Sequence, residues 1–383
     1  MEKTKGTILY VGKFNLPDKG ASANRVVSNG KIFRKLGYQV AYLGVSNQVY
    51  EGEIGPLDGE KHMHEEAYPK SSSQWLKHMV STDNIEKLAD MYGDVKMIIL
   101  YNAPYTLLLN TKKKFSKRGI KVVYDCTEWT GVTDGSLPKR AMKKIDEYFI
   151  RNKIHHKADG LIVISSMMEE GYKGCKHMVK LPPLIDLNNP IWNQKIERDS
   201  VFEFCWAGML DGNKDSLDRL VEAYSSLEKG NVRLRIIGVS KEEFCDFYNK
   251  GTELIGNCKN EIIFMGMQPH KETIKYVSNC DCYIFIRQSD MRNNAGFPTK
   301  FSESFSCGVP IIATDISDVD RYMKSCNGKL LSQLSVETIR EAMIEEMGCA
   351  GENGRSNYHH NDIFHYENYV DVCEKWFEEI FRI

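Results

Sequence analysis

The chain of 383 residues is 42% hydrophobic and 27% charged, with a formal net charge of −1 at pH 7. Single hydrophobic cores stop growing near roughly 250 to 300 residues, so this length predicts two folded domains. The near-neutral charge excludes an attraction of the whole molecule to nucleic acid, and the sequence lacks an apolar run near the ~20 residues that span a bilayer.

The first half of the chain alternates short apolar runs with longer helical patterns. A helix is predicted at residues 23–36, and residues 48–75 are polar and irregular, which predicts an insertion or loop. Alternation of this kind is typical of β-α-β units with a parallel sheet. Buried strands are predicted at residues 7–11, 39–43, 97–101, 121–124 and 160–164.

A segment without periodicity, residues 187–200, separates this half from a second series of strands and helices. Two Rossmann-like α/β domains are therefore predicted, at residues 1–190 and 191–360. Residues 366–383 have the pattern of an amphipathic helix, and we expect residues 361–383 to cross back to the first domain. Strands of the second half are predicted at residues 202–207, 233–238, 262–265, 282–286 and 310–313, with a helix at 216–228.

Cysteines and histidines give no metal signal. The eleven cysteines are scattered without C-x-x-C spacing, which favours reduced thiols. Residues 62–66 (HMHEE) hold ligand-type side chains without a positioned third ligand, so a solvated loop is predicted there. The first residues, MEKTKGTILYVGKF, lack the apolar region of a secretory signal, and we expect a cytoplasmic protein.

The most specific segment is GFPTKFSESFSCGVPIIAT, residues 296–314. Gly296 and Pro298 predict a turn, and Thr299 is in position to cap the helix that follows. Gly308 and Pro310 end this helix before a buried strand. The unpaired N–H groups and partial positive charge of such a helix start suit a diphosphate.

Two charged residues follow this helix start. Lys300 lies in the first turn, where a cation opposes the helix dipole, and an anion between the two explains this placement. Glu303 lies one turn further on the same face, in position to accept hydrogen bonds from vicinal hydroxyls such as those of a ribose.

The run PTKFSESFSCGVPII resembles the donor-binding signature of the family 4 retaining glycosyltransferases of GT-B fold (group 1 glycosyltransferases). The second glutamate of that signature falls on Glu303. The first falls on Ala295, so the sequence follows a variant with P-x-K before the glutamate, which implies unchanged diphosphate contacts and altered sugar contacts. This variant often occurs in enzymes that build surface polysaccharides. Candidates to replace the missing acid are Asp290, Asn293 and Asn294.

The resemblance continues along most of the chain. WAGMLDGNK is similar to the first strand and loop of the family's second domain, and Lys214 matches the phosphate-binding lysine of that loop. Met209 stands where the family commonly has an arginine. Arg287 is the candidate to supply the missing positive charge. RLRIIG and FMGMQPH resemble the strand ends that hold the nucleobase, and PDKGASANRV resembles the glycine loop that faces the donor phosphates. These matches imply donor-binding roles for Gly20, Ala21, Gly208, Gly238, Gly266, Met267, Gly296, Phe297, Pro298 and Thr299.

The resemblance implies retaining sugar transfer from a nucleotide-diphosphate donor, UDP- or GDP-sugar, to a glycan or lipid-linked acceptor, with no metal or other cofactor. The leaving phosphate itself takes the acceptor proton, and Lys214, Arg287 and Lys300 stabilise the leaving group. Asp125 and Glu128 follow a first-domain strand, so the rule that ligands bind at the carboxyl ends of parallel strands makes them candidates for acceptor or sugar contacts.

Residues 112–157 hold thirteen Lys and Arg against five Asp and Glu. We hypothesise that this basic flank rests on anionic membrane, peripherally on its inner face, or meets a lipid-diphosphate acceptor. A solvated helix explains the same charges.

Other functions remain open on this architecture. A nucleotide-sugar epimerase would turn over its ligand without an acceptor. A non-enzymatic two-lobed binding protein is expected to carry a secretion signal, which the sequence lacks. A dinucleotide oxidoreductase is disfavoured because neither half carries G-x-G-x-x-G followed by an acid about 20 residues later.

Overall fold

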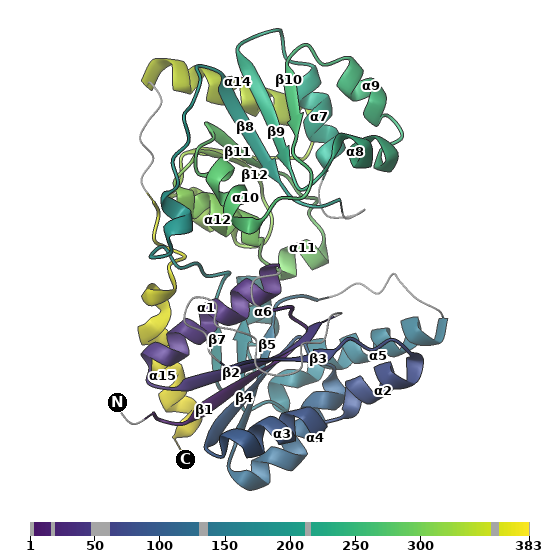
Figure 1. The fold of residues 1–383 in the computed structure, drawn as a ribbon, viewed down its shortest axis with the longest axis vertical. Coiled ribbons are helices and arrows are strands. Elements are labelled where there is room, and N and C mark those ends of the chain that lie inside the picture. The colour runs from purple at the N-terminus through teal and green to yellow at the C-terminus, as the bar shows by residue number, and fades with distance from the viewer. Residues whose placement is uncertain are drawn as a thin grey trace. The chain divides into compact units, whose positions relative to one another are not determined.

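The structure is a computed structural model that describes residues 4–16, 20–46, 62–129, 137–210, 216–353 and 360–382. The chain divides into two compact units, which are described separately (Figure 1). Unit 1 contains Met1–Ile185, Ala295–Phe297 and His365–Ile383, and unit 2 contains Asp186–Asn294 and Pro298–Phe364. Within the described ranges, no helix has both the length and the apolar character to cross a membrane.

Unit 1 is built on a parallel sheet in the strand order β3-β2-β1-β4-β5-β6-β7. The predicted loop at residues 48–75 is wrong in its second part, because β3 pairs with β2 and α2 begins at Ser72; residues 48–61 lie outside the described residues. The strands are β1 (Thr7–Gly12), β2 (Gln39–Ser46), β3 (Met63–Ala67), β4 (Val95–Tyr101), β5 (Lys121–Cys126), β6 (Gly160–Val163) and β7 (Met178–Lys180).

Helices cover this sheet in two groups. Helix α15, formed by residues near the end of the chain, packs against α1, whereas α2 and α5 both pack against α4. The helices of unit 1 are α1 (Ala21–Lys35), α2 (Ser72–Val80), α3 (Asp83–Tyr92), α4 (Tyr105–Phe115), α5 (Leu137–Lys153), α6 (Ser166–Gly171) and α15 (Val370–Phe381), with 3-10 turns at Ser116–Arg118, Ile154–His156 and Tyr366–Tyr369.

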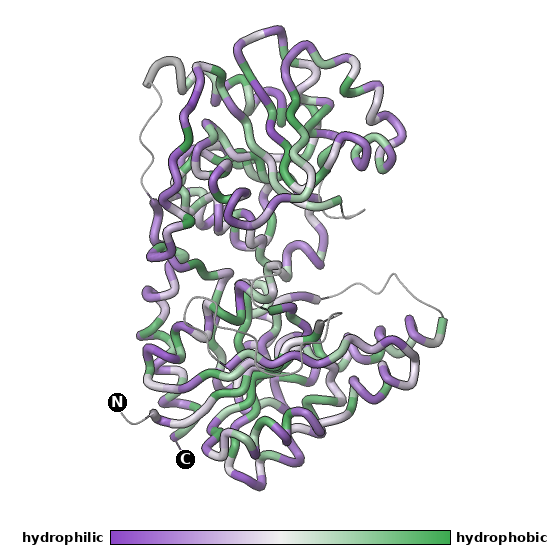
Figure 2. The backbone as a smooth tube through the Cα atoms, viewed as in Figure 1, coloured by the Kyte–Doolittle hydropathy of each residue, from purple (hydrophilic) through white to green (hydrophobic). Residues whose placement is uncertain are grey.

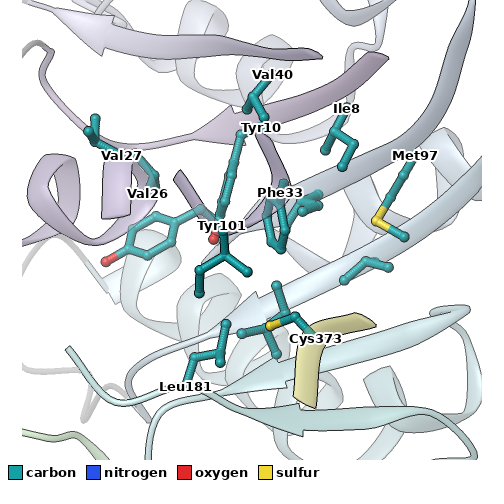
Figure 3. Close-up of a cluster of buried hydrophobic side chains, with 14 of the residues drawn as sticks. Ile8, Tyr10, Val26, Val27, Phe33, Val40, Met97, Tyr101, Leu181 and Cys373 are labelled. Atoms are coloured by element: carbon teal, nitrogen blue, oxygen red, sulfur yellow. The ribbon is translucent and has the colours of Figure 1, made fainter. Parts of the chain in front are cut away.

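The core of unit 1 joins both ends of its sequence. Trp376, Phe377 and Ile380 of α15 are buried in the same cluster as Ile8 and Phe33. Figure 3 shows Cys373 of α15 beside the side chains of the first strands and α1. The apolar face predicted for residues 366–383 is therefore buried in the core of unit 1, on an α-helix that begins at Val370 after a 3-10 turn.

Unit 2 repeats the architecture with a parallel sheet in the order β10-β9-β8-β11-β12-β13. Its strands are β8 (Phe202–Ala207), β9 (Val232–Ile237), β10 (Glu261–Phe264), β11 (Cys282–Phe285), β12 (Ile311–Thr314) and β13 (Gly328–Leu331). The helices of this half are α7 (Leu217–Ser225), α8 (Lys241–Phe247), α9 (Gly251–Gly256), α10 (His270–Val277), α11 (Met291–Ala295), α12 (Thr299–Cys307), α13 (Val319–Met323) and α14 (Val336–Asn353), with a 3-10 turn at Pro190–Asn193.

The two sheets share the doubly wound strand order, in which the direction of winding reverses between β1 and β4 in unit 1 and between β8 and β11 in unit 2. Apart from edge strands such as β3 (MHEEA), their strands are among the most hydrophobic stretches of the chain (Figure 2), as expected for parallel strands buried on both faces. The predicted α/β class with two Rossmann-like halves is confirmed. Ligands of such sheets bind beyond the carboxyl ends of the strands at the reversal point.

Candidate functional site

Three glycines meet at the carboxyl ends of β8, β9 and β10 in unit 2. The Gly238 N–H donates to the Gly266 carbonyl at 2.8 Å, and the Gly208 N–H donates to the Ile237 carbonyl at 3.0 Å. A Cβ atom on Gly238, whose φ is +96°, would lie 2.0 Å from the Gly208 carbonyl oxygen, so no side chain fits there. Met267, beside this edge, is 69% exposed. The N–H groups of all three glycines thus bond within the edge, which consists of backbone and not of side chains at these positions.

Helix α12 begins close to the predicted position but with a different cap. Pro298 is its N-cap, Thr299 is the first helical residue, and among the described residues no side chain caps the helix, so the predicted Thr299 cap is wrong. The Phe301 and Ser302 amides donate to the Pro298 carbonyl. Gly308 ends the helix in the left-handed conformation with φ +75°, as the sequence predicts.

Glu303 of α12 is buried and accepts hydrogen bonds from two cationic-type side chains. Lys300 Nζ lies 2.9 Å from Oε2, and His270 Nε2 lies 2.8 Å from Oε1. Burial alone would raise the pKa of this carboxyl, but the charges of Lys300 and His270 and their hydrogen bonds outweigh it and lower the pKa to about 2. Glu303 is therefore an ionised, oriented acceptor.

His270 is the residue of this cluster that the sequence reasoning missed. It is the first residue of α10, directly after Pro269, and α10 packs against α12. The segment FMGMQPH directed attention to Gly266 and Met267 because their family resemblance was to a nucleobase contact. The available signal was the position of His270 after the turn that follows β10.

At the carboxyl end of β11, Arg287 is half-buried, with its guanidinium 5.4 Å from the centre of the Phe285 ring. Its N–H donates to the Thr314 hydroxyl at the end of β12. Arg287 thus lies at the strand edge from which α12 follows. Lys214 lies outside the described residues, so its predicted convergence with Arg287 and Lys300 stays a prediction.

The three candidates to replace the missing family glutamate hold their own loop together. The Asp290 carboxylate accepts a hydrogen bond from the backbone N–H of Asn293, and the side-chain amide of Asn293 donates to the Gln288 carbonyl. Asn294 accepts from the Ser317 N–H. Each of these side chains therefore has a local role in shaping the segment before α12.

In unit 1, Asp125 is buried with no exposed surface and pairs with Arg25 at 2.8 Å. It also accepts a hydrogen bond from the Tyr10 hydroxyl, and the Arg25 guanidinium continues to the Leu181 carbonyl. Its carboxylate thus has protein partners inside unit 1, and the exposed neighbour Glu128 is the group that faces solvent.

The remaining nominated residues of unit 1 lie in two segments. Gly20, with φ +102°, is the N-cap of α1, and Ala21 is its first residue. Gly296 and Phe297 belong to the short segment grouped with unit 1, and Phe297 is 7% exposed.

The histidine and glutamate side chains in and near β3, which are potential metal ligands, form hydrogen bonds and an ion pair within unit 1. His64 hydrogen-bonds the Tyr92 hydroxyl at 2.9 Å, and Glu66 accepts from Asn84 and pairs with His78. No group of three or more potential ligands comes together within the described part of the chain.

A known protein family matches the part of the chain that contains Glu303. Residues 202–347 match the family model "Glycosyl transferases group 1". The matched region contains the glycine edge, Arg287, Lys300 and Glu303. No curated protein sequence matches the chain significantly.

Solved structures resemble the chain over almost its full length. Sucrose-phosphate synthase (tll1590) from Thermosynechococcus elongatus has a TM-score of 0.71 at 13% identity, covering 98% of this chain and 99% of that one. Alr3699/HepE from Anabaena, in complex with UDP and glucose, has a TM-score of 0.63 at 12% identity, covering 97% and 99%. WaaG, a glycosyltransferase involved in lipopolysaccharide biosynthesis, has a TM-score of 0.62 at 13% identity, covering 95% and 99%. These likenesses establish the GT-B fold.

Proposed function

We propose that this chain is a retaining glycosyltransferase that moves a sugar from a nucleotide-diphosphate donor to a glycan or lipid-linked acceptor in surface polysaccharide or glycoconjugate synthesis. The observation that carries the proposal is Glu303, an ionised carboxylate fixed by Lys300 and His270 inside the region that matches the family model. The complex of Alr3699/HepE with UDP and glucose supports a donor of this class.

The roles follow from the charges at this edge. Glu303 accepts hydrogen bonds from the ribose hydroxyls of the donor, because each carboxylate oxygen keeps a lone pair beyond its bond to Lys300 or His270. The glycine edge receives the base through backbone groups. Lys300, Arg287 and Lys214 stabilise the diphosphate as it leaves, which takes up negative charge in the transition state.

The catalytic step needs no nucleophile from the protein. The bond between the anomeric carbon and the diphosphate breaks, the acceptor oxygen bonds to the same face of that carbon, and the leaving phosphate takes the acceptor proton. The buried Asp125 is assigned to holding β5 and α1 together, and Glu128 is the candidate for an acceptor contact. The proposal includes metal independence, so chelation leaves turnover unchanged.

A thermal-shift panel with UDP-, GDP-, ADP- and dTDP-sugars, each with and without EDTA, tests this proposal. We expect one nucleotide class to raise the melting temperature equally in both conditions. Lys300→Ala should abolish this shift, and Lys324→Ala, a matched exposed lysine of unit 2, should keep it. No shift with any nucleotide, or equal shifts in both variants, would contradict the assignment. Turnover of the donor without any acceptor would indicate the epimerase instead.

The proposal extends to the location of the enzyme. Residues 112–157 hold thirteen Lys and Arg against five Asp and Glu, a difference of +8 in a chain whose net charge is −1. A lipid-linked acceptor lies in a membrane, so peripheral contact with anionic lipid on its cytoplasmic face fits this charge.

A further inference from the structure

Helix α5 of unit 1 exposes more large apolar side chains than an ordinary surface helix, although Phe149 stacks on Tyr105 of α4. Toward the body of the unit it directs polar groups: Asp146 accepts the Tyr105 N–H at 2.8 Å, and the Arg151 guanidinium lies 4.9 Å from the centre of the Trp129 ring. Toward solvent it directs Leu137, Ile145 and Tyr148, which are 80%, 59% and 58% exposed. A helix that only covers a core buries its apolar face and exposes its polar one.

The exposed apolar residues of α5 form one continuous stripe. At 3.6 residues per turn, Leu137, Met142, Ile145 and Tyr148 fall within an arc of about 140°. The neighbouring Phe149 stacks on Tyr105 of α4, with the ring centres 5.0 Å apart. The two edges of this arc are basic, with Lys144 on one side and Lys153 on the other, and both lysines are exposed. Long basic side chains beside an apolar stripe, with a tyrosine within it, are the composition of a helix that lies in a membrane interface.

Helix α2 shows the same combination of side chains independently. Leu76 and Val80, one turn apart, are 48% and 44% exposed, and the Lys77 side chain beside them is 72% exposed and lies 3.5 Å from Asp83. Both α2 and α5 pack against α4, whose last turn carries Lys113 together with Lys112 and Lys114, which pair with Asp159 and Glu86. Apolar stripes and cations thus occur together on two helices of one helical layer.

We propose that α5 is an interfacial helix that binds the surface of an anionic phospholipid bilayer, with α2 as a secondary contact. Leu137, Ile145 and Tyr148 enter the boundary between headgroups and acyl chains, and the flanking lysines contact lipid phosphates. We infer a bilayer because its acyl chains complement the apolar stripe and its anionic headgroups complement the basic edges. The inference rests on the peripheral membrane contact proposed above and deepens it, but it does not depend on sugar transfer.

Co-sedimentation of the full chain with large unilamellar vesicles, without nucleotide, tests the inference. We expect binding to vesicles of phosphatidylcholine with 30% phosphatidylglycerol, little binding to phosphatidylcholine alone, and weaker binding at high salt. Because no donor is present, failure here leaves the nucleotide proposal standing, and failure of the thermal-shift panel leaves this result standing.

Two sets of variants separate the stripe from the charge. The triple variant Leu137→Ser, Ile145→Ser, Tyr148→Ser should weaken vesicle binding by at least about tenfold, because the inserted apolar area is lost. Its control, Met91→Ser, Ile344→Ser, Val372→Ser, changes three exposed apolar residues elsewhere, 66%, 44% and 44% exposed, and should bind like the wild type. Lys144→Gln with Lys153→Gln, the two edges of the stripe, should weaken binding by about tenfold to thirtyfold, whereas Lys241→Gln with Lys250→Gln, equally exposed positions of unit 2, should not.

Unchanged melting temperatures establish that each variant is folded before binding is measured. Failure of the wild type to sediment with anionic vesicles overturns the inference, as does equal binding by the stripe variant and its control. Self-association of the wild type without vesicles, abolished by the stripe variant, would assign this face to a second copy of the chain and also overturn it.

Discussion

His270 Nε2 lies 2.8 Å from Glu303 Oε1, a contact that joins the first turn of α10 to the second turn of α12. Two crossover helices of unit 2 thereby fix the direction of one buried carboxylate. Lys300 fixes the other oxygen from within α12. Glu303 is thus oriented before any ligand arrives, which lowers the ordering cost of binding.

His270→Ala should therefore weaken binding of the matching nucleotide by about tenfold to a hundredfold, the range for a hydrogen bond to a charged group. Isothermal titration of the folded variant measures this change. His270→Gln, which keeps a side-chain N–H donor, should recover part of the affinity, and Lys271→Ala on the same helix should bind like the wild type. A full-affinity His270→Ala variant would show that the contact is only structural.

Glu303 also makes stability depend on pH. Its folded-state pKa of about 2 lies below the ordinary 4.5, so the stabilisation is fully present above pH 4.5 and is lost as the pH falls toward 2. The groups that face it are Lys300 and His270. The difference in free energy of unfolding between the wild type and Glu303→Gln should shrink by about 3 kcal/mol over that window. Urea denaturation of both proteins between these pH values measures it, and a constant difference would contradict the ion-pair interpretation.

Gly238→Ala should destabilise unit 2 by about 2 to 4 kcal/mol, because the new Cβ meets the Gly208 carbonyl and the backbone has a positive φ. Gly256→Ala is the matched control, since no atom lies within 4 Å of a Cβ at that position. We expect the control to change stability by less than about 1 kcal/mol. Guanidinium denaturation compares the two, and equal effects would contradict the close approach of the two strand ends.

Asp125→Ala should destabilise unit 1 by about 3 to 5 kcal/mol, since it leaves the buried Arg25 charge without its partner. The exposed pair of Glu170 and Lys173 offers a contrast, because both side chains are more than two-thirds exposed. Glu170→Ala should change the free energy of unfolding by less than about 1 kcal/mol. A stable Asp125→Ala protein with lost transferase activity would instead return Asp125 to a catalytic role.

Much of the fold could be predicted from the sequence, because parallel strands that are buried on both faces consist of short runs of apolar residues. Strand β3 was missed because its sequence, MHEEA, has polar side chains and only Met63 is buried. Among the described strands it lies at the edge of the sheet, next to β2. An edge strand with partly exposed side chains lacks the apolar signal that identified its neighbours.

The sequence predicted the site residues whose place depends on the local backbone. It did not predict the contacts between side chains that are distant in the sequence. Gly208 directly follows one predicted strand and Gly238 is the last residue of another, so their positions were accessible. His270 and Glu303 are 33 residues apart, and only the packing of α10 on α12 reveals their contact. Asp125 was correctly placed at a strand end, but its partner Arg25, 100 residues earlier, determines that it is buried.

Helix α15 has a consequence for how the protein is made. Its Trp376 and Ile380 lie against Gly160 of β6, where a Cβ atom would be 2.7 Å from the Ile380 side chain. During synthesis the first 185 residues leave the ribosome before α15 has been translated. The part of unit 1 that α15 covers therefore stays exposed to solvent until the residues of unit 2 have been synthesised. An isolated fragment ending at residue 185 should therefore aggregate or recruit chaperones, and adding α15 as a separate peptide should rescue it.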